Sequence, residues 1–98
     1  MEDVMDFVLR SRLAREILFS LYTHRRMYTR QVLGYAPARK RYDVLVRLAG
    51  YGLVRRYEGE LCRGRVCLKV VWNELTPDGV RVVKALRSMM GDGYGEDS

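Results

Sequence analysis

Two stretches decide the fold of this chain: LAGYGLVRR at residues 48–56 and WNELTPDG at residues 72–79. In the first, an apolar helical spacing ends at a pair of glycines, which commonly terminate helices, and β-formers follow directly. In the second, a run of β-formers ends at Thr76, which can cap a helix that has Pro77 at its first position. The two junctions therefore enclose a β segment between two helices.

The segment between the junctions, residues 53–75, changes to a period of two and predicts a β-hairpin. A two-residue turn at Gly64 and Arg65 fixes the pairing of the two strands. The resulting opposite pairs are Arg63/Val66, Cys62/Cys67, Leu61/Leu68, Glu60/Lys69, Tyr57/Trp72 and Arg55/Glu74. A longer loop starting at Gly59 would also leave Cys62 and Arg63 near the tip, so both loops remain open at this stage.

Upstream of the first junction, residues 37–50 have the spacing of an amphipathic helix, with Pro37 suited to its first position. The apolar face consists of Ala38, Tyr42, Leu45, Leu48 and Ala49. The other face carries Arg39, Lys40, Asp43 and Arg47, with Arg41 at its border. Because the cations crowd into the first two turns, we expect this helix to present a basic N-terminal half to solvent.

Three further helices complete the pattern. One is expected over about 11–23 with Ser11 as its N-cap, and a short one from a Thr29 cap to the stop signal at Gly34. The last begins after Thr76 and runs to about residue 90. An apolar stripe over residues 4–8 either extends the first of these helices or forms a separate short helix.

The length of 98 residues fits a single domain, with a core over about 11–90 and short acidic terminal segments at 1–10 and 91–98. An apolar content of 48% is typical of globular chains. No apolar run reaches membrane-spanning length, and the chain starts with acidic residues where a signal peptide would be basic. We therefore expect a cytoplasmic protein with no membrane partner.

The charge of the chain is concentrated in its middle. The formal net charge is +6, but residues 11–90 hold 17 of the 18 Lys and Arg residues and only six of the 12 acidic residues. A segment this basic attracts nucleic acids or anionic membrane surfaces. Fifteen of the cations are Arg, which suits phosphate and guanine contacts, although a GC-rich genome gives the same bias.

The order helix, short helix, basic helix, hairpin, helix resembles winged helix-turn-helix transcription regulators of the MarR, PadR and ArsR type. Residues 48–56 resemble the passage from their recognition helix into the first wing strand. Residues 72–79 resemble their strand-to-helix junction, a hydrophobic residue followed by Leu, Thr, Pro, any residue and Gly. The resemblance implies a mostly α fold with a small β-hairpin wing, in which helix 37–50 enters the major groove of double-stranded DNA and the wing touches the backbone or the minor groove.

This resemblance, with the chemistry of the side chains, gives a set of candidate DNA-binding residues: Thr29, Arg30, Gln31, Arg39, Lys40, Arg41, Asp43, Arg47, Arg63 and Arg65. Arg and Lys on the exposed half of a recognition helix reach guanine, and a carboxylate can accept from cytosine. Asp43 can instead bridge to Arg39 or Arg47 at helical spacing. Residues 29–31 can simply cap their helix, and an Arg-rich wing tip can serve solubility alone.

The two cysteines face each other at a non-hydrogen-bonded position of the proposed register, where a disulfide between Cys62 and Cys67 is sterically allowed. Cytosolic disulfides are rare outside hyperthermophiles, but one Gln and one Asn among 31% charged residues indicate a thermophile. The oxidation state therefore stays open. The single His24 has no partner at useful spacing, and the chain carries no zinc signature, triad or phosphate loop. We expect no metal, no cofactor and no enzyme activity.

The last helix has more apolar surface than one core requires. Val82, Ala85 and Met89 form one stripe, and Val80, Val83, Leu86 and Met90 form another. We assign the second stripe to a homodimer interface, together with Val4, Phe7 and Val8. The function expected is that of a sequence-specific transcription regulator on a roughly palindromic site, with no known effector. The alternative is a winged helix that binds protein or RNA within a larger assembly.

Overall fold

The computed structural model describes residues 3–34 and 38–91, with side chains as far as Met89. The elements follow in the order α1 (Val4–Arg10), α2 (Arg12–His24), β1 (Arg26–Tyr28), α3 (Thr29–Leu33), α4 (Ala38–Gly50), β2 (Val54–Arg63), β3 (Val66–Leu75) and α5 (Pro77–Gly91). This is the expected order of helices around a hairpin, with one addition, β1. The position expected for Pro37 lies outside the described residues.

Helix α1 is separate from α2. Asp3 accepts a hydrogen bond from the backbone N–H of Met5, and Ser11 accepts one from the N–H of Ala14 at 3.1 Å. Ser11 has extended backbone angles, so it ends one helix and caps the next. The Arg15 guanidinium donates to the carbonyls of Val8 and Leu9, which closes the C-terminus of α1 onto α2. Of the two alternatives for residues 4–8, the separate short helix is therefore the one that forms.

The first of the two junctions ends α4 in a Schellman motif. The N–H of Leu53 donates to the carbonyl of Leu48, and the N–H of Gly52 donates to that of Ala49, both at 3.0 Å. Gly52 has φ +80°, which a residue with a side chain rarely adopts. Leu48 and Leu53 are both buried, as the hydrophobic contact of this motif requires. The motif turns the chain sharply from α4 into the wing.

The two junctions meet in space. The Thr76 hydroxyl donates to the carbonyl of Gly52 at 2.6 Å and accepts from the N–H of Gly79 at 3.0 Å, so it caps α5 and ties it to the end of α4. The Thr76 N–H donates to the Leu53 carbonyl at 3.0 Å. A Cβ added to Gly79 would lie 2.1 Å from that same carbonyl oxygen, so only glycine permits this approach. The contact fixes where α5 starts and how it is rotated.

The hairpin has the predicted register, with Cys62 opposite Cys67, Tyr57 opposite Trp72 and Gly64 in the turn at φ +60°. The sheet also contains β1, which pairs antiparallel with β3 and gives the strand order β1-β3-β2. Strand β1 was not predicted from the sequence. It attaches the helix-turn-helix region directly to the base of the wing.

The core lies between the helices and the inner end of the sheet. Its buried members are Phe7, Val8, Ala14, Ile17, Leu18, Leu21, Val32, Leu45, Leu48, Leu53, Val54, Val83 and Leu86. This corrects the dimer assignment, because Val83 and Leu86 are fully buried within one chain and Phe7 and Val8 are buried with them. Val80 is half-buried, and the side chain of Met90 lies outside the described residues. In the other stripe of α5, Ala85 and Met89 are exposed, Met89 at 61%, while Val82 is partly buried against the core.

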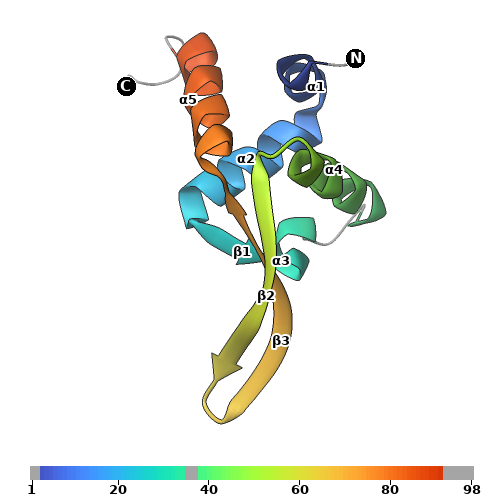
Figure 1. The fold of residues 1–98 in the computed structure, drawn as a ribbon, viewed down its shortest axis with the longest axis vertical. Coiled ribbons are helices and arrows are strands. Elements are labelled where there is room, and N and C mark those ends of the chain that lie inside the picture. The colour runs from blue at the N-terminus through green and yellow to red at the C-terminus, as the bar shows by residue number, and fades with distance from the viewer. Residues whose placement is uncertain (1–2, 35–37, 92–98) are drawn as a thin grey trace.

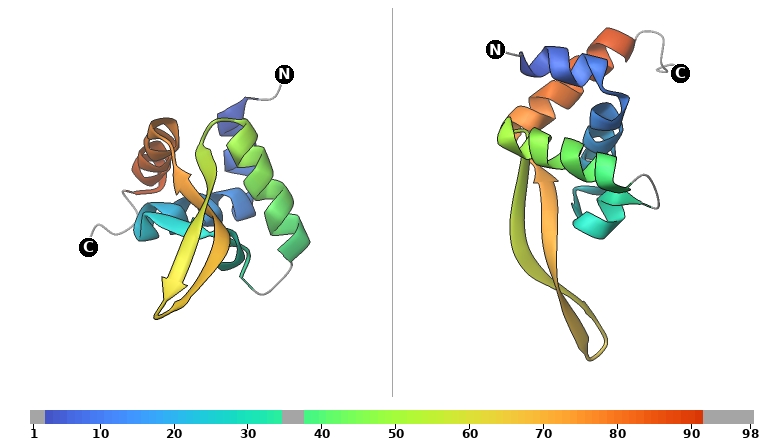
Figure 2. Two further views of the ribbon diagram at one scale, coloured as in Figure 1. Left: turned by 60° about the horizontal axis from the view of Figure 1, so that its bottom comes forward. Right: turned by 90° about the vertical axis from the view of Figure 1, so that its right-hand side faces the viewer.

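The hairpin projects well beyond the helices, as Figure 1 shows, and α1 and α5 lie at the end of the molecule away from its tip. Helices α3 and α4 lie together on one side of the hairpin base, which is clearest in the right-hand view of Figure 2. A helix-turn-helix pair beside a projecting β-hairpin is the winged-helix arrangement that the sequence predicted.

Candidate nucleic-acid interface

Helix α3 is a single turn placed by its own caps. Its N-cap is Tyr28, so Thr29 is the first helical residue and the predicted Thr29 cap is wrong by one position. The Gln31 side-chain oxygen accepts from the N–H of Tyr28 at 3.1 Å, which gives Gln31 a capping role. Gly34 ends the helix at φ +65°. Of the three candidates here, Arg30 is the one exposed cation.

Arg41 is a structural residue, which corrects its assignment to the DNA-binding set. Its side chain is 18% exposed and lies between α2, α3 and α4. The guanidinium donates twice to the carbonyl of Val32, at 3.1 and 3.2 Å, and once to the Glu16 carboxylate at 3.1 Å. Val32 lies in the last turn of α3, so these bonds satisfy a carbonyl that the helix leaves open. Arg41 thus locks the two helices of the helix-turn-helix at a fixed angle.

The exposed face of α4 presents Arg39, Lys40 and Asp43 together. Among the described residues, none forms an ion pair or hydrogen bond with these three side chains, so the alternative in which Asp43 bridges to Arg39 or Arg47 is absent here. Their donors and acceptors are available to a ligand. Val46 and Tyr42, each 41% exposed, lie on the same helix and add apolar surface. The apolar face predicted for this helix had wrongly included Tyr42 and Ala38.

Arg47 is used within the chain. Its guanidinium lies 4.5 Å from the centre of the Phe7 ring and 6.0 Å from that of Tyr51. Cation–π contacts of this kind attach α1 to the C-terminal half of α4. Arg47 is therefore not among the residues that we propose to contact DNA.

A buried polar cluster joins α3 to the base of the wing. Asn73 is fully buried and donates to the Met27 carbonyl at 3.0 Å and to the Thr29 hydroxyl at 3.2 Å. Its side-chain oxygen accepts from Arg56 at 2.8 Å, and Arg56 also donates to Thr29 at 3.1 Å. The hydroxyl of Thr29 is thus occupied internally. The cluster fixes the angle between the wing and the helix-turn-helix, and a single Asn within a run of β-formers was its only signal in the sequence.

Trp72 holds the base of the wing on the opposite face of the sheet. The Arg26 guanidinium lies 4.0 Å from the centre of its ring, and Tyr28 meets it edge-on at 5.8 Å. A Cβ on Gly59 would come within 2.5 Å of the indole, so the ring packs directly on the strand backbone. Tyr57 donates to Glu74 at 2.8 Å, and Arg55 pairs with the same carboxylate. These contacts make the emerging hairpin rigid.

The outer half of the wing is exposed and basic at its tip. Arg63 and Arg65 flank Gly64 and are fully available, since no described residue pairs with them. Between the wing and α3 lies an open groove of about 510 Å³, whose lining includes Arg30, Arg56 and Lys69. Lys69 is a cation that the sequence reasoning did not assign, although its place opposite Glu60 was predicted. The groove therefore has cations on both of its walls.

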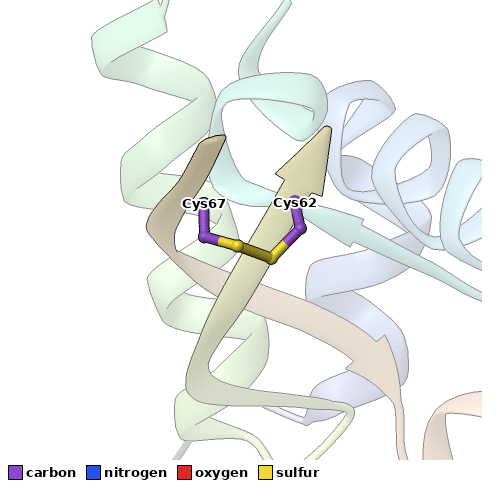
Figure 3. The surroundings of a disulfide bond; sticks show 2 residues. All are labelled: Cys62 and Cys67. Carbon is purple, nitrogen blue, oxygen red and sulfur yellow. A yellow bond between two sulfur atoms is a disulfide. The ribbon is translucent and has the colours of Figure 1, made fainter. Parts of the chain in front are cut away.

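The cysteines of the wing form a disulfide, with the two Cα atoms 4.0 Å apart (Figure 3). With Glu60 they are the one group of possible metal ligands among the described residues. Joined as a disulfide, the sulfur atoms are poor ligands, because thiolates bind metals. His24 is exposed at the end of α2. No helix in the described ranges has the length and apolar character needed to cross a membrane.

The arrangement defines a winged helix-turn-helix fold. A solved structure with the same fold is that of a cysteine-to-serine mutant of MarR from E. coli in complex with operator DNA, with a TM-score of 0.66 at 16% sequence identity. The match covers 90% of this chain and 61% of the MarR chain, so the chain spans less than two thirds of that protein's length. No family model and no curated protein sequence matches the chain. At this identity the likeness confirms the fold that the two junctions predicted.

Proposed function

We propose that the protein is a sequence-specific regulator that binds double-stranded DNA through α4 and the wing. The observation that carries the proposal is the set of unpaired polar side chains on one helix face: Arg39, Lys40 and Asp43 project from α4, while neighbouring Arg41 and Arg47 are used inside the chain. A helix with these groups on its exposed half fits a major groove about 12 Å wide. The fold that it shares with MarR, solved on operator DNA, supports the same role.

The rest of the interface follows from the fixed position of the wing. With α4 in the major groove, the tip arginines reach the neighbouring backbone or minor groove, where cations are attracted most strongly. Arg30 and Lys69 border the groove between α3 and the wing, and they contact the phosphates of the strand that runs through it. In this proposal α4 determines the sequence specificity. Affinity for any duplex comes from the cations outside α4, which are Arg30, Arg63, Arg65 and Lys69.

We further propose that the protein acts as a homodimer through the end opposite the wing tip. The exposed apolar side chains there are Leu9 at 44% and Met89 at 61%, and Ala85 is exposed on the same helix as Met89. A symmetric dimer places two recognition helices about one DNA turn apart, which suits a palindromic site. This replaces the buried stripe of Val83 and Leu86 as the interface.

A salt-dependent shift assay on a pool of genomic duplex fragments tests the proposal. We expect a few fragments to be retained at a salt concentration that releases the rest, since base contacts survive where counterion-driven binding fails. Release of all fragments at the same salt concentration would show that the protein binds DNA without sequence specificity. Stronger retention of structured RNA than of any duplex DNA would instead favour an RNA-binding module.

The contribution of the wing is measured on the same fragments. Replacing Arg63 and Arg65 by Ala should weaken binding to every sequence alike and reduce the slope of log affinity against log salt by about one for each phosphate that the wing no longer reaches. Weaker binding confined to particular base pairs would show that the wing reads sequence.

A further inference from the structure

The disulfide of the wing is open to chemical attack. Cys62 and Cys67 are both exposed, and Figure 3 shows their bond joining the two strands of the wing. A disulfide is reduced when a thiolate reaches one of its sulfur atoms, so access governs the reaction. An exposed disulfide of this kind is more labile than a buried structural one.

The fold does not depend on this bond. Toward the core, β2 and β3 remain paired over eight residue pairs, from Val54/Leu75 to Leu61/Leu68. The core cluster contains no residue from 58–71, the outer part of the hairpin. The bond closes a loop with a sequence separation of only 5, so it constrains the unfolded chain weakly compared with disulfides that close long loops. Reduction should therefore leave the domain folded.

The bond does constrain the wing tip. Four residues, Arg63 to Val66, lie between the two cysteines, and both tip arginines are among them. With the bond intact, these residues belong to a closed ring that contains the turn at Gly64. Once the bond opens, the tip gains conformational freedom that must be given up again when the arginines contact a ligand. The oxidised tip is the more preorganised of the two forms.

We propose that Cys62 and Cys67 form a site of reversible thiol–disulfide exchange with a dithiol, and that oxidation of this site strengthens DNA binding. The second half of this inference rests on the proposed function. A thiolate of the dithiol attacks one cysteine sulfur, and the other sulfur leaves and takes up a proton. The second thiol of the reductant then resolves the mixed disulfide. Two electrons and two protons pass to the cysteines, and the reductant leaves as its own disulfide; an oxidised dithiol reverses the exchange.

The experiment equilibrates the full chain in mixtures of reduced and oxidised dithiothreitol, with a chelator present so that metal capture by the thiols and Glu60 cannot contribute. Alkylation followed by mass measurement counts the free thiols, and fluorescence anisotropy gives the affinity for a labelled duplex at fixed salt. The sequence contains only these two cysteines, so every effect of the redox buffer on the protein passes through them. Far-UV circular dichroism follows the fold.

We expect two thiols per chain to appear under native conditions with an unchanged circular dichroism spectrum. Affinity should fall by about three- to ten-fold on reduction, because part of the tip backbone must then be ordered on binding. The variant C62S/C67S should bind like the reduced protein in both buffers. In the R63A/R65A variant the redox effect should shrink toward one-fold, because the arginines that benefit from the ordered tip are gone.

Two results would overturn the inference. If thiols appear only after denaturation, the native protein has no exchange site. If the oxidised and reduced forms have equal affinity for DNA, the disulfide has no effect on DNA binding. If neither form binds any duplex, the proposed function is wrong, and the thiol count under native conditions still decides whether the exchange site exists.

Discussion

Replacing Arg41 by Ala, with Arg39 by Ala as the matched control, tests whether Arg41 has a structural role. Arg39 lies two residues away on the same helix, has no partner among the described residues, and is one of the residues that we propose to contact DNA. In the wild type, the Arg41 guanidinium makes two hydrogen bonds to the Val32 carbonyl and one to Glu16. Hydrogen bonds from a charged donor contribute about 1.5–3 kcal/mol, and the half-exposed ion pair with Glu16 adds little. We therefore expect R41A to reduce the free energy of unfolding by about 2 kcal/mol.

For a domain of this size, such a change lowers Tm by about 8–16 °C. The matched variant R39A should keep the wild-type Tm within about 2 °C, because an exposed unpaired side chain contributes little to stability. The assays are thermal unfolding followed by circular dichroism and anisotropy on a selected duplex. Below its Tm, R41A should bind more tightly than R39A. An R41A protein with unchanged Tm and abolished binding would refute the structural role given to Arg41.

Three further predictions test the fold and the assembly. G79A should cost about 3 kcal/mol, since its Cβ would lie 2.1 Å from the backbone carbonyl of Leu53. G59A should cost less, because its Cβ would meet a side chain, Trp72, and not backbone. Chemical denaturation measures both, and equal costs would contradict the packing. N73A should destabilise the chain by about 3 kcal/mol, since the part-buried Met27 carbonyl loses its hydrogen bond from Asn73 and Arg56 loses the Asn73 acceptor, and a wild-type denaturation midpoint would contradict the cluster. M89E changes an exposed residue and should turn a dimer into a folded monomer in light scattering, whereas V83E changes a buried one and should unfold the chain. A wild-type mass near 11.5 kDa at micromolar concentration would exclude the dimer.

The parts of the fold that the sequence predicted are those set by local chemistry. The hairpin register follows from a turn at Gly64, and the caps at Ser11 and Thr76 act within three residues of themselves. Strand β1 escaped prediction because it is three residues long and exists only through its pairing with Trp72–Glu74, far along the chain. A backbone partner at that distance leaves no periodic signal in the strand itself.

The wrong predictions for Arg41 and for the dimer interface on α5 have a related cause. Helix α5 carries two apolar stripes, and which one enters the core depends on its rotation, which the contact between Gly79 and Leu53 fixes. Arg41 was placed at the border of an exposed face, but its guanidinium donates to the open carbonyl of Val32 on the neighbouring helix. Periodicity describes one helix at a time. The position of an acceptor on a neighbouring helix depends on tertiary packing, which periodicity does not contain.

The central claim is that the exposed face of α4 reads DNA sequence, and a charge-reversal pair tests it most directly. R39E/K40E changes two unpaired cations on α4, and R81E/K84E makes the same change in net charge on exposed positions of α5. Affinity for a selected duplex and for a random duplex is measured by anisotropy at one salt concentration. We predict that R39E/K40E abolishes the preference for the selected duplex while remaining folded, and that R81E/K84E lowers both affinities slightly and keeps the preference. An equal decrease in affinity in the two variants would show that net charge, and not contacts from α4, governs binding.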